Sequence, residues 1–386
     1  MAREYRDSGI DWIGLIPKEW NAIRLKYLCT IQTGNKDTQD STPDGIYPFY
    51  VRSPKVEKSE TYSFDGEGIL MAGDGVGAGR VFHHVFGKYA VHQRVYRLAN
   101  ITGINSSFLF YYISNLFGKE MDRGSAQSTV PSVRLPMLQN FIISAPSFSE
   151  QQKIADYLDK VCGEVDEMVA LQETMIEELK AYKQSVITEA VTKGLNPNVP
   201  MRNSGIDWIG EIPEHWILSK AKFFVDITNG CDPKTEGNIP VYGSGASSFK
   251  TCGEYKEGPT VLIGRKGATL HIPHYIEGKY WNVDTAFDVK VKNGFDLRYY
   301  YYTAICFDYK YYISQTTLPG MAQSSYNNMI IPVPSIEEQC SIASYLDTKC
   351  SEIDSLIALK LAKIEELKEY KKSVIYEYVT GKKEVV

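Results

Sequence analysis

A heptad pattern of apolar residues follows residue 145. From Ile154 the apolar positions succeed one another at alternating steps of four and three, with one polar exception at Gln172. The set is Ile154, Leu158, Val161, Val165, Met168, Gln172, Met175, Leu179, Tyr182 and Val186. This spacing is typical of a helix that packs along one seam against a partner helix. We expect a long helix over 146–193; an amphipathic helix on a globular core is the plainer alternative.

A second, looser heptad pattern occupies residues 334–386. The apolar positions on register are Ile342, Leu346, Ile353, Leu356, Leu367, Tyr370 and Val374. Lys349, Lys360 and Lys363 interrupt the pattern, and Ile357, Leu361 and Ile364 then indicate a local shift of phase. The pattern predicts a second long helix, with a pairing register that the sequence leaves open.

The chain is an internal duplication, because its landmarks return in the same order. Ser-Gly-Ile-Asp-Trp-Ile-Gly recurs, as do a Glu-Gln…Ile-Ala…Tyr-Leu-Asp opening and a Glu-Leu-Lys…Tyr-Lys…Ser-Val-Ile ending of each helix. The matching pairs of ranges are 8–14 with 204–210, 150–159 with 338–347, and 178–187 with 366–375. A duplication constrains the architecture more than local propensity does.

Five segments follow from the repeat and the helices. They are a first globular domain over 1–145, a first helix over 146–193, a linker over 194–203, a second domain over 204–333 and a second helix over 334–386. If the ends of the second domain lie close together, the second helix packs on the first only by running back along it. We therefore expect an antiparallel pair with pseudo-two-fold symmetry, and two domains at its ends facing the same side.

The distribution of charge favours the domains as the part that meets a polyanion. The chain carries a net charge of −5. Residues 21–145 nevertheless hold 13 basic against 10 acidic residues, and residues 217–333 hold 12 against 10. The helical segments are acidic, with 5 against 10 and 8 against 10. Mildly basic domains suit nucleic-acid binding, which depends on neutralising phosphates.

Catalytic and metal-binding motifs are missing from the sequence. No Asn/Asp-Pro-Pro-Tyr/Phe element occurs, the glycine-rich stretch 73–79 has Arg80 where a dinucleotide fingerprint needs glycine, and Gly264-Arg-Lys-Gly-Ala-Thr269 is no P-loop. The seven cysteines are scattered and the histidines lack partners at ligand spacing. We expect no enzyme activity, no metal and no bound cofactor in this chain.

Polar residues near glycines are the candidates for reading base edges, because they carry the required donors and acceptors. The candidates are Arg80, His92, Gln93, Arg94, Gln127 and Ser128 in the first domain, and Arg265, Lys266, Gln323, Ser324, Asn327 and Asn328 in the second. We place the two Gln-Ser pairs at equivalent positions before each helix. Ordinary polar surface is the alternative for each single residue, and the tyrosines of 299–302 fit a packed helix better than base stacking.

The repeated motifs together resemble, over the whole chain, the specificity subunit of type I restriction-modification systems. The resemblance implies an α/β (α+β) fold class, with two mixed α/β target recognition domains separated by two long antiparallel coiled-coil helices. It also implies that each domain reads half of a bipartite duplex DNA target and that the helices set the unspecified spacer between the halves.

The partners follow from the same resemblance. Two adenine methyltransferase (M) subunits would bind around the helices, and restriction and motor (R) subunits would join for cleavage. AdoMet, ATP and Mg would then belong to those partners. The specificity subunit of a type IIB-like enzyme and a non-DNA coiled-coil interaction scaffold are the alternatives. No apolar run suits a signal peptide or a membrane span, so we expect a cytoplasmic protein.

Overall fold

The chain forms two compact units, each of which contains part of both long helices. The computed structural model describes residues 3–124, 131–245, 247–292, 294–313 and 319–385. Unit 1 comprises Met1–Gln172 with Ala362–Val386, and unit 2 comprises Glu173–Leu361. Both units combine sheets and helices, which confirms the expected mixed α/β fold class.

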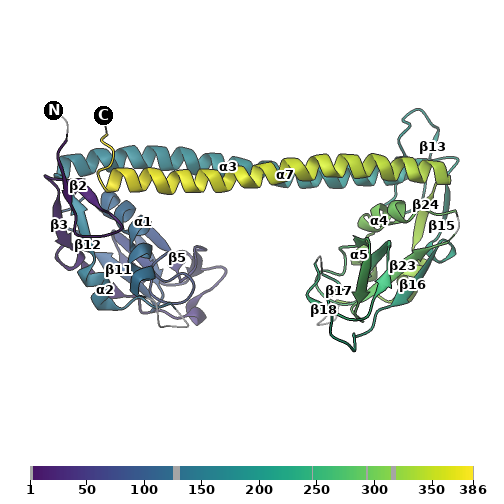
Figure 1. The fold of residues 1–386 in the computed structure, drawn as a ribbon, viewed down its shortest axis with the longest axis horizontal. Helices are drawn as coiled ribbons and strands as arrows, with labels where there is room; N and C mark the ends of the chain where they lie inside the picture. The colour runs from purple at the N-terminus through teal and green to yellow at the C-terminus, as the bar shows by residue number, and fades with distance from the viewer. Residues whose placement is uncertain (1–2, 125–130, 246, 293, 314–318, 386) are drawn as a thin grey trace. The chain divides into compact units, whose positions relative to one another are not determined.

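Two four-stranded sheets form the centre of unit 1 (Figure 1). The first is antiparallel, with the order β4 (Thr30–Thr33), β11 (Val95–Ala99), β8 (Gly68–Ala72) and β9 (Phe82–Val85). The second has the order β6 (Glu57–Ser59), β5 (Tyr47–Tyr50), β10 (Lys88–Val91) and β7 (Phe64–Asp65), with β5 parallel to β10. All five residues of β8 are buried, as expected for a central strand without an exposed face.

Helices and short pairings complete unit 1. They are β1 (Tyr5–Asp7) with β2 (Leu15–Pro17), β3 (Asn21–Arg24) with β12 (Ile142–Ala145), η1 (Leu25–Tyr27), η2 (Thr38–Asp40), α1 (Ser106–Gly124) and α2 (Leu135–Asn140). Phe108, Tyr112 and Phe117 of α1 are fully buried in the core of the unit. The same core takes in Leu158 from the first long helix and Val379 from the second. The globular domain of unit 1 is therefore packed onto the helices.

Unit 2 repeats this plan with shorter helices. Its first sheet has the order β16 (Val225–Asn229), β23 (Ala286–Val291), β20 (Thr260–Gly264) and β21 (His274–Ile276). Its second sheet has the order β18 (Lys250–Cys252), β17 (Ile239–Tyr242), β22 (Lys279–Asn282) and β19 (Lys256–Glu257). The remainder are β13 (Met201–Asn203) with β14 (Glu211–Pro213), β15 (Ile217–Lys220) with β24 (Ile330–Val333), η3 (Ala221–Phe223), α4 (Leu297–Ile305), α5 (Tyr309–Tyr312) and α6 (Gln323–Asn328). Tyr299, Tyr300 and Tyr302 of α4 are buried, as packing residues.

The long helices are α3 (Phe148–Lys193) and α7 (Ile336–Val379). Each begins two residues after the expected boundary, because a serine at 147 and 335 caps it; Ser335 Oγ accepts from the Glu338 N–H at 3.2 Å. Each is followed by a glycine with positive φ, Gly194 at 75° and Gly381 at 70°. The second helix therefore ends at Val379, short of the expected residue 386.

A buried glutamine at the start of each helix explains the repeated Glu-Gln. Gln151 Oε1 accepts from the Asn105 N–H at 2.7 Å, while its Nε2 donates to the Pro146 carbonyl at 2.9 Å. Gln339 makes the same two bonds, with the Asp296 N–H at 2.8 Å and the Pro334 carbonyl at 2.9 Å. Each glutamine thus ties a long helix to the first turn of the domain's own helix.

α3 and α7 run antiparallel within each unit (Figure 1). In unit 1, Asp166 faces Lys371 at 2.7 Å, and the ring of Tyr157 lies 4.5 Å from that of Tyr378. Towards the C-terminus of α3 the partners therefore come from earlier in α7. Unit 2 shows the same order, with Lys183 against Asp354 at 2.7 Å. The expected antiparallel pairing is confirmed.

The seam of α3 differs from the expected one at every second position. Met175 is 36% exposed whereas its neighbour Ile176 is 5% exposed. The inward residues, buried or half-buried, are Leu158, Cys162, Val165, Val169, Gln172, Ile176, Leu179, Lys183 and Ile187. Apolar residues stand at both the third and the fourth position after Leu158, Val165 and Gln172, so both frames fit the sequence there; after Leu179 the fourth position is Lys183. Val161, Met168, Met175 and Tyr182 were therefore assigned wrongly to the seam centre.

The seam of α7 is continuous, which corrects the expected interruption. Its inward residues are Leu346, Cys350, Ile353, Ile357, Lys360, Ile364, Leu367, Lys371 and Val374. In this frame Lys349 and Lys363 do not belong to the seam, and Ile357 and Ile364 need no shift of phase. Lys360, by contrast, belongs to the seam, and its Nζ lies 3.2 Å from Met175 Sδ. A lysine stem can pack there while its amine reaches the rim.

The segment that continues the repeated Ser-Gly-Ile-Asp-Trp-Ile-Gly motif packs at a helix end, through Trp20 in unit 1 and Trp216 in unit 2. Trp20 packs beside the end of α7, where a Cβ on Gly381 would lie 3.1 Å from its ring. Trp216 packs in the same way beside Gly194 at the end of α3. Both tryptophans are buried. The N-terminal motif thus closes onto the C-terminal helix, as the internal motif closes onto the first helix.

None of the helices in the described ranges is long and apolar enough to cross a bilayer.

Candidate nucleic-acid interface

Five loops of unit 1 gather at one end of its sheets, and we call residues 34–40, 51–53, 73–81, 92–94 and 131–133 the first loop edge. Backbone hydrogen bonds join them. Asn35 N donates to Val91 O at 3.2 Å and His92 N donates to Tyr50 O at 3.0 Å. Gly73 N donates to Arg94 O at 2.9 Å. Segments distant in sequence therefore present their side chains together.

Asp74 lies at the centre of the first loop edge, between two arginines. Arg52 Nη1 donates to Asp74 Oδ1 and Arg94 Nη1 donates to Asp74 Oδ2, both at 3.0 Å. The Asp74 side chain is 17% exposed, whereas that of Arg94 is 61% exposed. The carboxylate is thus largely covered while the guanidinium groups face solvent. Arg94 belongs to the expected set; Arg52 and Asp74 do not.

A second acid, Asp37, engages two more of the expected residues. Gln93 Nε2 donates to Asp37 Oδ2 at 2.8 Å, and His92 Nε2 lies 3.4 Å from Asp37 Oδ1. His92 is buried, and its Nδ1 accepts from the Arg94 N–H at 3.0 Å. A backbone hydrogen bond from Thr38, with the nearby His92, holds the pKa of Asp37 below its usual value. His92 therefore shapes the loop from within, while Gln93 lies at its surface.

Arg80 closes the glycine-rich turn that begins at Gly73. Its Nη2 donates to Asp122 Oδ1 of α1 at 2.6 Å, and both side chains are exposed. The turn itself is tightly packed, because a Cβ on Gly77 would lie 2.4 Å from the Arg52 carbonyl oxygen. Val76 stands 95% exposed within the turn. A cavity of about 410 Å³ lies here, lined among others by Arg52, Asp74 and Val76.

Unit 2 carries an equivalent loop edge with different charges. Arg265 N donates to Thr285 O at 2.8 Å, as Gly73 N does to Arg94 O, so Lys266 occupies the place of Asp74. Lys266 pairs with Asp284 at 3.6 Å. The guanidinium of Arg265 reaches the Asp284 carbonyl at 3.3 Å and lies over the Phe287 ring. The second loop edge thus carries a basic side chain, Lys266, where the first carries the acidic Asp74.

The remaining expected residues of unit 2 lie on α6. Gln323 Nε2 donates to the Ile227 carbonyl of β16 at 2.5 Å, and Asn328 Nδ2 donates to the Ser324 carbonyl at 2.9 Å. Ser324 is exposed and Asn327 is half-buried. Gln323 and Asn328 therefore use their amides on the protein, whereas Arg265 and Lys266 belong to the loop edge.

The Gln-Ser pairs are not equivalent, which corrects their expected relationship. Asn140 ends α2 with the bond to Pro136 that Asn328 makes to Ser324 in α6, so the equivalent of Gln323 is Leu135. Gln127 and Ser128 lie outside the described residues. Their sequence, Gln-Ser-Thr-Val-Pro up to Pro131, matches Gln-Thr-Thr-Leu-Pro up to Pro319. The carbonyls of these prolines accept from Gly75 and Gly267, at 3.0 and 2.9 Å. That repeat was the missed signal.

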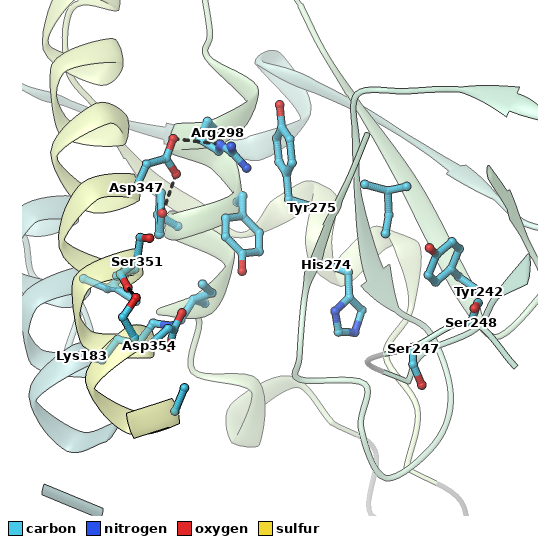
Figure 2. A pocket seen from close by; sticks show the side chains of 18 residues that line it. Lys183, Tyr242, Ser247, Ser248, His274, Tyr275, Arg298, Asp347, Ser351 and Asp354 are labelled. Atoms are coloured by element: carbon cyan, nitrogen blue, oxygen red, sulfur yellow. Dashed lines mark hydrogen bonds and ion pairs between the residues drawn. The ribbon is translucent and has the colours of Figure 1, made fainter. Parts of the chain in front are cut away.

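The cleft in Figure 2 lies between the helix pair and the sheet of unit 2. Its volume is about 920 Å³; Asp347, Ser351 and Asp354 of α7 line one wall, and His274 and Tyr275 of β21 line the other. Tyr302 Oη donates to Asp347 Oδ1 at 2.7 Å, and Arg298 Nε donates to Asp347 Oδ2 at 3.1 Å. These bonds attach the globular domain of unit 2 to the helices.

The protonation states of Tyr302 and His274 in this cleft are consistent with a role in attaching the domain to the helices. Burial, with the hydrogen bond to Asp347, raises the pKa of Tyr302 far above its usual value. Burial lowers the pKa of His274, which is therefore neutral near pH 7. Unit 1 repeats the bond, because Tyr111 Oη donates to Asp159 Oδ1 at 2.7 Å. The cleft is accordingly a joint between domain and helix.

Duplicated mixed α/β domains on an antiparallel helix pair, each with its own polar loop edge, define a protein with two recognition units. A family model for the type I restriction modification DNA specificity domain matches residues 17–181 and 217–369. The chain belongs to this family, and it supplies the DNA sequence specificity of a type I restriction-modification system.

Relatives agree with this assignment. The chain is 24% identical to the type I restriction enzyme MjaVIII specificity subunit of Methanocaldococcus jannaschii, across 95% of this chain and 93% of that one. It is 29% identical to the EcoDI specificity subunit of Escherichia coli, across 50% of this chain and 42% of that one, so this match spans less than half of that relative. A solved chain from a study of complex assembly in the type I R-M system has the same fold, with a TM-score of 0.70, 16% identity and coverage of 95% and 99%.

Proposed function

We propose that the chain reads a bipartite duplex DNA target, one short word at each loop edge, and has no catalytic activity of its own. The observation that carries this proposal is the duplication of the whole unit, with loop edges that differ in charge. Equivalent frames with different readers suit two different words. Both domains hold an excess of basic residues, which suits contact with phosphates.

The spacing between the words would come from the long helices. α3 has 46 residues and would extend about 70 Å at 1.5 Å per residue. A continuous helix pair is stiff, so it would hold the two readers on the same side of one duplex at a set separation. The unspecified spacer would then reflect helix length.

Two adenine methyltransferase subunits would bind the outer surface of the helices. Exposed apolar residues recur there at heptad spacing and at equivalent places of the repeat. They are Met168, Leu171 and Tyr370 in unit 1, and Leu356, Leu359 and Tyr182 in unit 2, which we call the outer stripe. Repeated apolar surface of this kind suits two copies of one partner. Restriction and motor subunits would join the assembly through the methyltransferases.

AdoMet, ATP and Mg would be bound by those partners. Two glycines of the turn at 73–79, Gly73 and Gly77, already pack against the backbone of Arg94 and Arg52. This close packing supports the proposal that the turn is structural and that the cofactors belong to the partners. Work on chromosomal DNA would take place in the cytoplasm.

Two assays with the full chain test this function. Fluorescence anisotropy should show duplex binding whose log affinity falls linearly with log salt concentration. Labelled AdoMet should transfer no methyl group to DNA until the methyltransferase is added. A flat salt response would indicate a scaffold that does not bind DNA, and methyl transfer by the chain alone would show a catalytic protein.

Partner docking has its own test. Leu171→Glu and Leu359→Glu should each reduce the methyltransferase content of the complex from two copies to one, measured by native mass spectrometry. Leu171→Met, which keeps an apolar side chain, is the matched control. Two bound copies in both glutamate variants would place the partner elsewhere.

A further inference from the structure

We propose that Asp74, with the Arg52 and Arg94 side chains it holds, is the specificity-determining element of the first domain and reads a G·C base pair in the major groove. The inference rests on the proposed function, since it assigns bases to one loop edge of that reader. The three residues come from three loops, following β5, β8 and β10.

The contacts leave the guanidinium groups directed at solvent. Each arginine contacts Asp74 through Nη1, at 3.0 Å, so that one edge of each fork is anchored. The Asp74 side chain is 17% exposed, whereas the side chains of Arg52 and Arg94 are 46% and 61% exposed. Anchored forks lose less side-chain freedom when they bind, which is the benefit of preorganisation.

The backbone beneath Asp74 is held from both sides. Asp74 forms a β-bridge with Ser132, and Val133 N donates to Gly73 O at 2.8 Å. On the other side Gly73 N donates to Arg94 O at 2.9 Å. The acid and the loop that carries Arg94 therefore have a common support.

The chemistry favours base reading over phosphate binding. An arginine fork donates two hydrogen bonds to O6 and N7 of guanine, a pattern that other bases do not offer in the major groove. A carboxylate between two arginines weakens their attraction to a polyanion, so it opposes a purely phosphate-binding role. It does, however, fix the direction of the forks. This combination is expected where orientation matters more than charge.

The second domain lacks this element, which confines its effect to one word. Lys266 occupies the place of Asp74, and its partner Asp284 corresponds to Gln93. A change at Asp74 or Arg94 should therefore alter the first word of the target and leave the second word intact.

The test uses the full chain assembled with its methyltransferase on duplexes in which each base pair of the target is replaced in turn. Arg94→Lys keeps the positive charge and removes the fork. We expect discrimination at one G·C pair of one word to fall by about 10- to 100-fold, with the salt dependence unchanged. Asp74→Asn should relax the same pair and raise the affinity for unrelated duplexes, because one negative charge is lost.

Lys88→Gln is the matched control, since Lys88 lies on β10 at the end away from the loop edge. It should leave discrimination at every position unchanged. Uniformly weaker binding of Arg94→Lys to all duplexes, or unchanged discrimination, would overturn the inference while the split target of the wild type stands. Absence of any split target for the wild-type complex would instead overturn the proposed function. Thermal melts of both variants exclude misfolding as the cause.

Discussion

Lys371 Nζ lies 2.7 Å from both carboxylate oxygens of Asp166. Lys183 makes the same contact with Asp354. The repeat offset of 188 residues relates Lys183 to Lys371 and Asp166 to Asp354. Each long helix thus provides the acid in one unit and the lysine in the other. This reciprocity is what a duplicated chain produces when it pairs with its own copy, and it sets the register of α3 against α7.

The register can be tested at this ion pair. Lys371→Asp places two acids together and should lower the stability of unit 1 by about 1 kcal/mol, since exposed ion pairs contribute roughly 0.2–1 kcal/mol. The double variant Asp166→Lys with Lys371→Asp should recover most of that loss. Denaturant unfolding at low salt measures both. Equal loss in the single and double variants would show that the two residues do not meet.

The frame of the seam is tested by two neighbouring residues. Ile176→Ala should cost about 2–4 kcal/mol, because it removes a buried side chain from the helix interface. Met175→Ala should cost less than about 1 kcal/mol, since that side chain is 36% exposed. Thermal or urea unfolding distinguishes them. A larger effect at Met175 would restore the frame first expected from the sequence.

The buried glutamines should be needed for attachment of the domains. Gln339→Leu keeps the volume but removes the acceptor of the Asp296 N–H and the donor to the Pro334 carbonyl. The loss should be about 2–3 kcal/mol, because buried backbone groups are left unpaired. Gln184→Leu, on the exposed surface of α3, is the control and should change stability little. Similar unfolding midpoints for the two variants would contradict this role.

Acid should weaken unit 2 through Glu338. Burial opposes ionisation there, yet hydrogen bonds from His215, Trp216 and the Ser335 N–H hold the pKa of Glu338 below its usual 4.5. A carboxyl group with a lowered folded-state pKa contributes stability above pH 4.5, and that contribution is lost as the pH falls through the folded value. Glu338→Gln should therefore destabilise the protein at pH 7 and flatten the fall below pH 4.5. Parallel pH profiles for variant and wild type would exclude this contribution.

Helix length should set the spacing of the target. Inserting one heptad into each long helix, after Gln172 and after Leu361, preserves the pairing and adds about 10 Å, or roughly three base pairs at 3.4 Å each. Both words should remain and the spacer should grow by three. If the insertion variant still methylated targets with the original spacer length, helix length would not determine the spacing of the target.

The sequence predicts the architecture because the chain is an internal duplication, in which each set of motifs occurs twice. The duplicated motifs and heptads locate the starts of both long helices within two residues, and they favour antiparallel pairing if the ends of the second domain lie close together. The predicted seam is wrong where Val161-Cys162 and Met175-Ile176 offer apolar residues in both frames. Only contact with the other helix decides between them, and that contact is set by a partner almost 200 residues away.

The candidate interface was harder to predict, because its residues meet only through the fold. Arg94 stood out beside a glutamine and a histidine, but Asp74 sits in a glycine-rich stretch and Arg52 follows a different strand. Nothing local joins the three. The Gln-x-Thr-x-Pro repeat ending at Pro131 and Pro319 is visible in the sequence, and it relates the two domains where the two Gln-Ser pairs do not.

Methylome sequencing of cells that carry this chain with its methyltransferase tests the central claim most directly. Two readers on one pair of helices should yield adenine methylation within a motif of two short, different words separated by a fixed unspecified spacer. Arg94→Lys should change one word alone. A single uninterrupted methylated word, read without a spacer, would contradict two recognition units acting together.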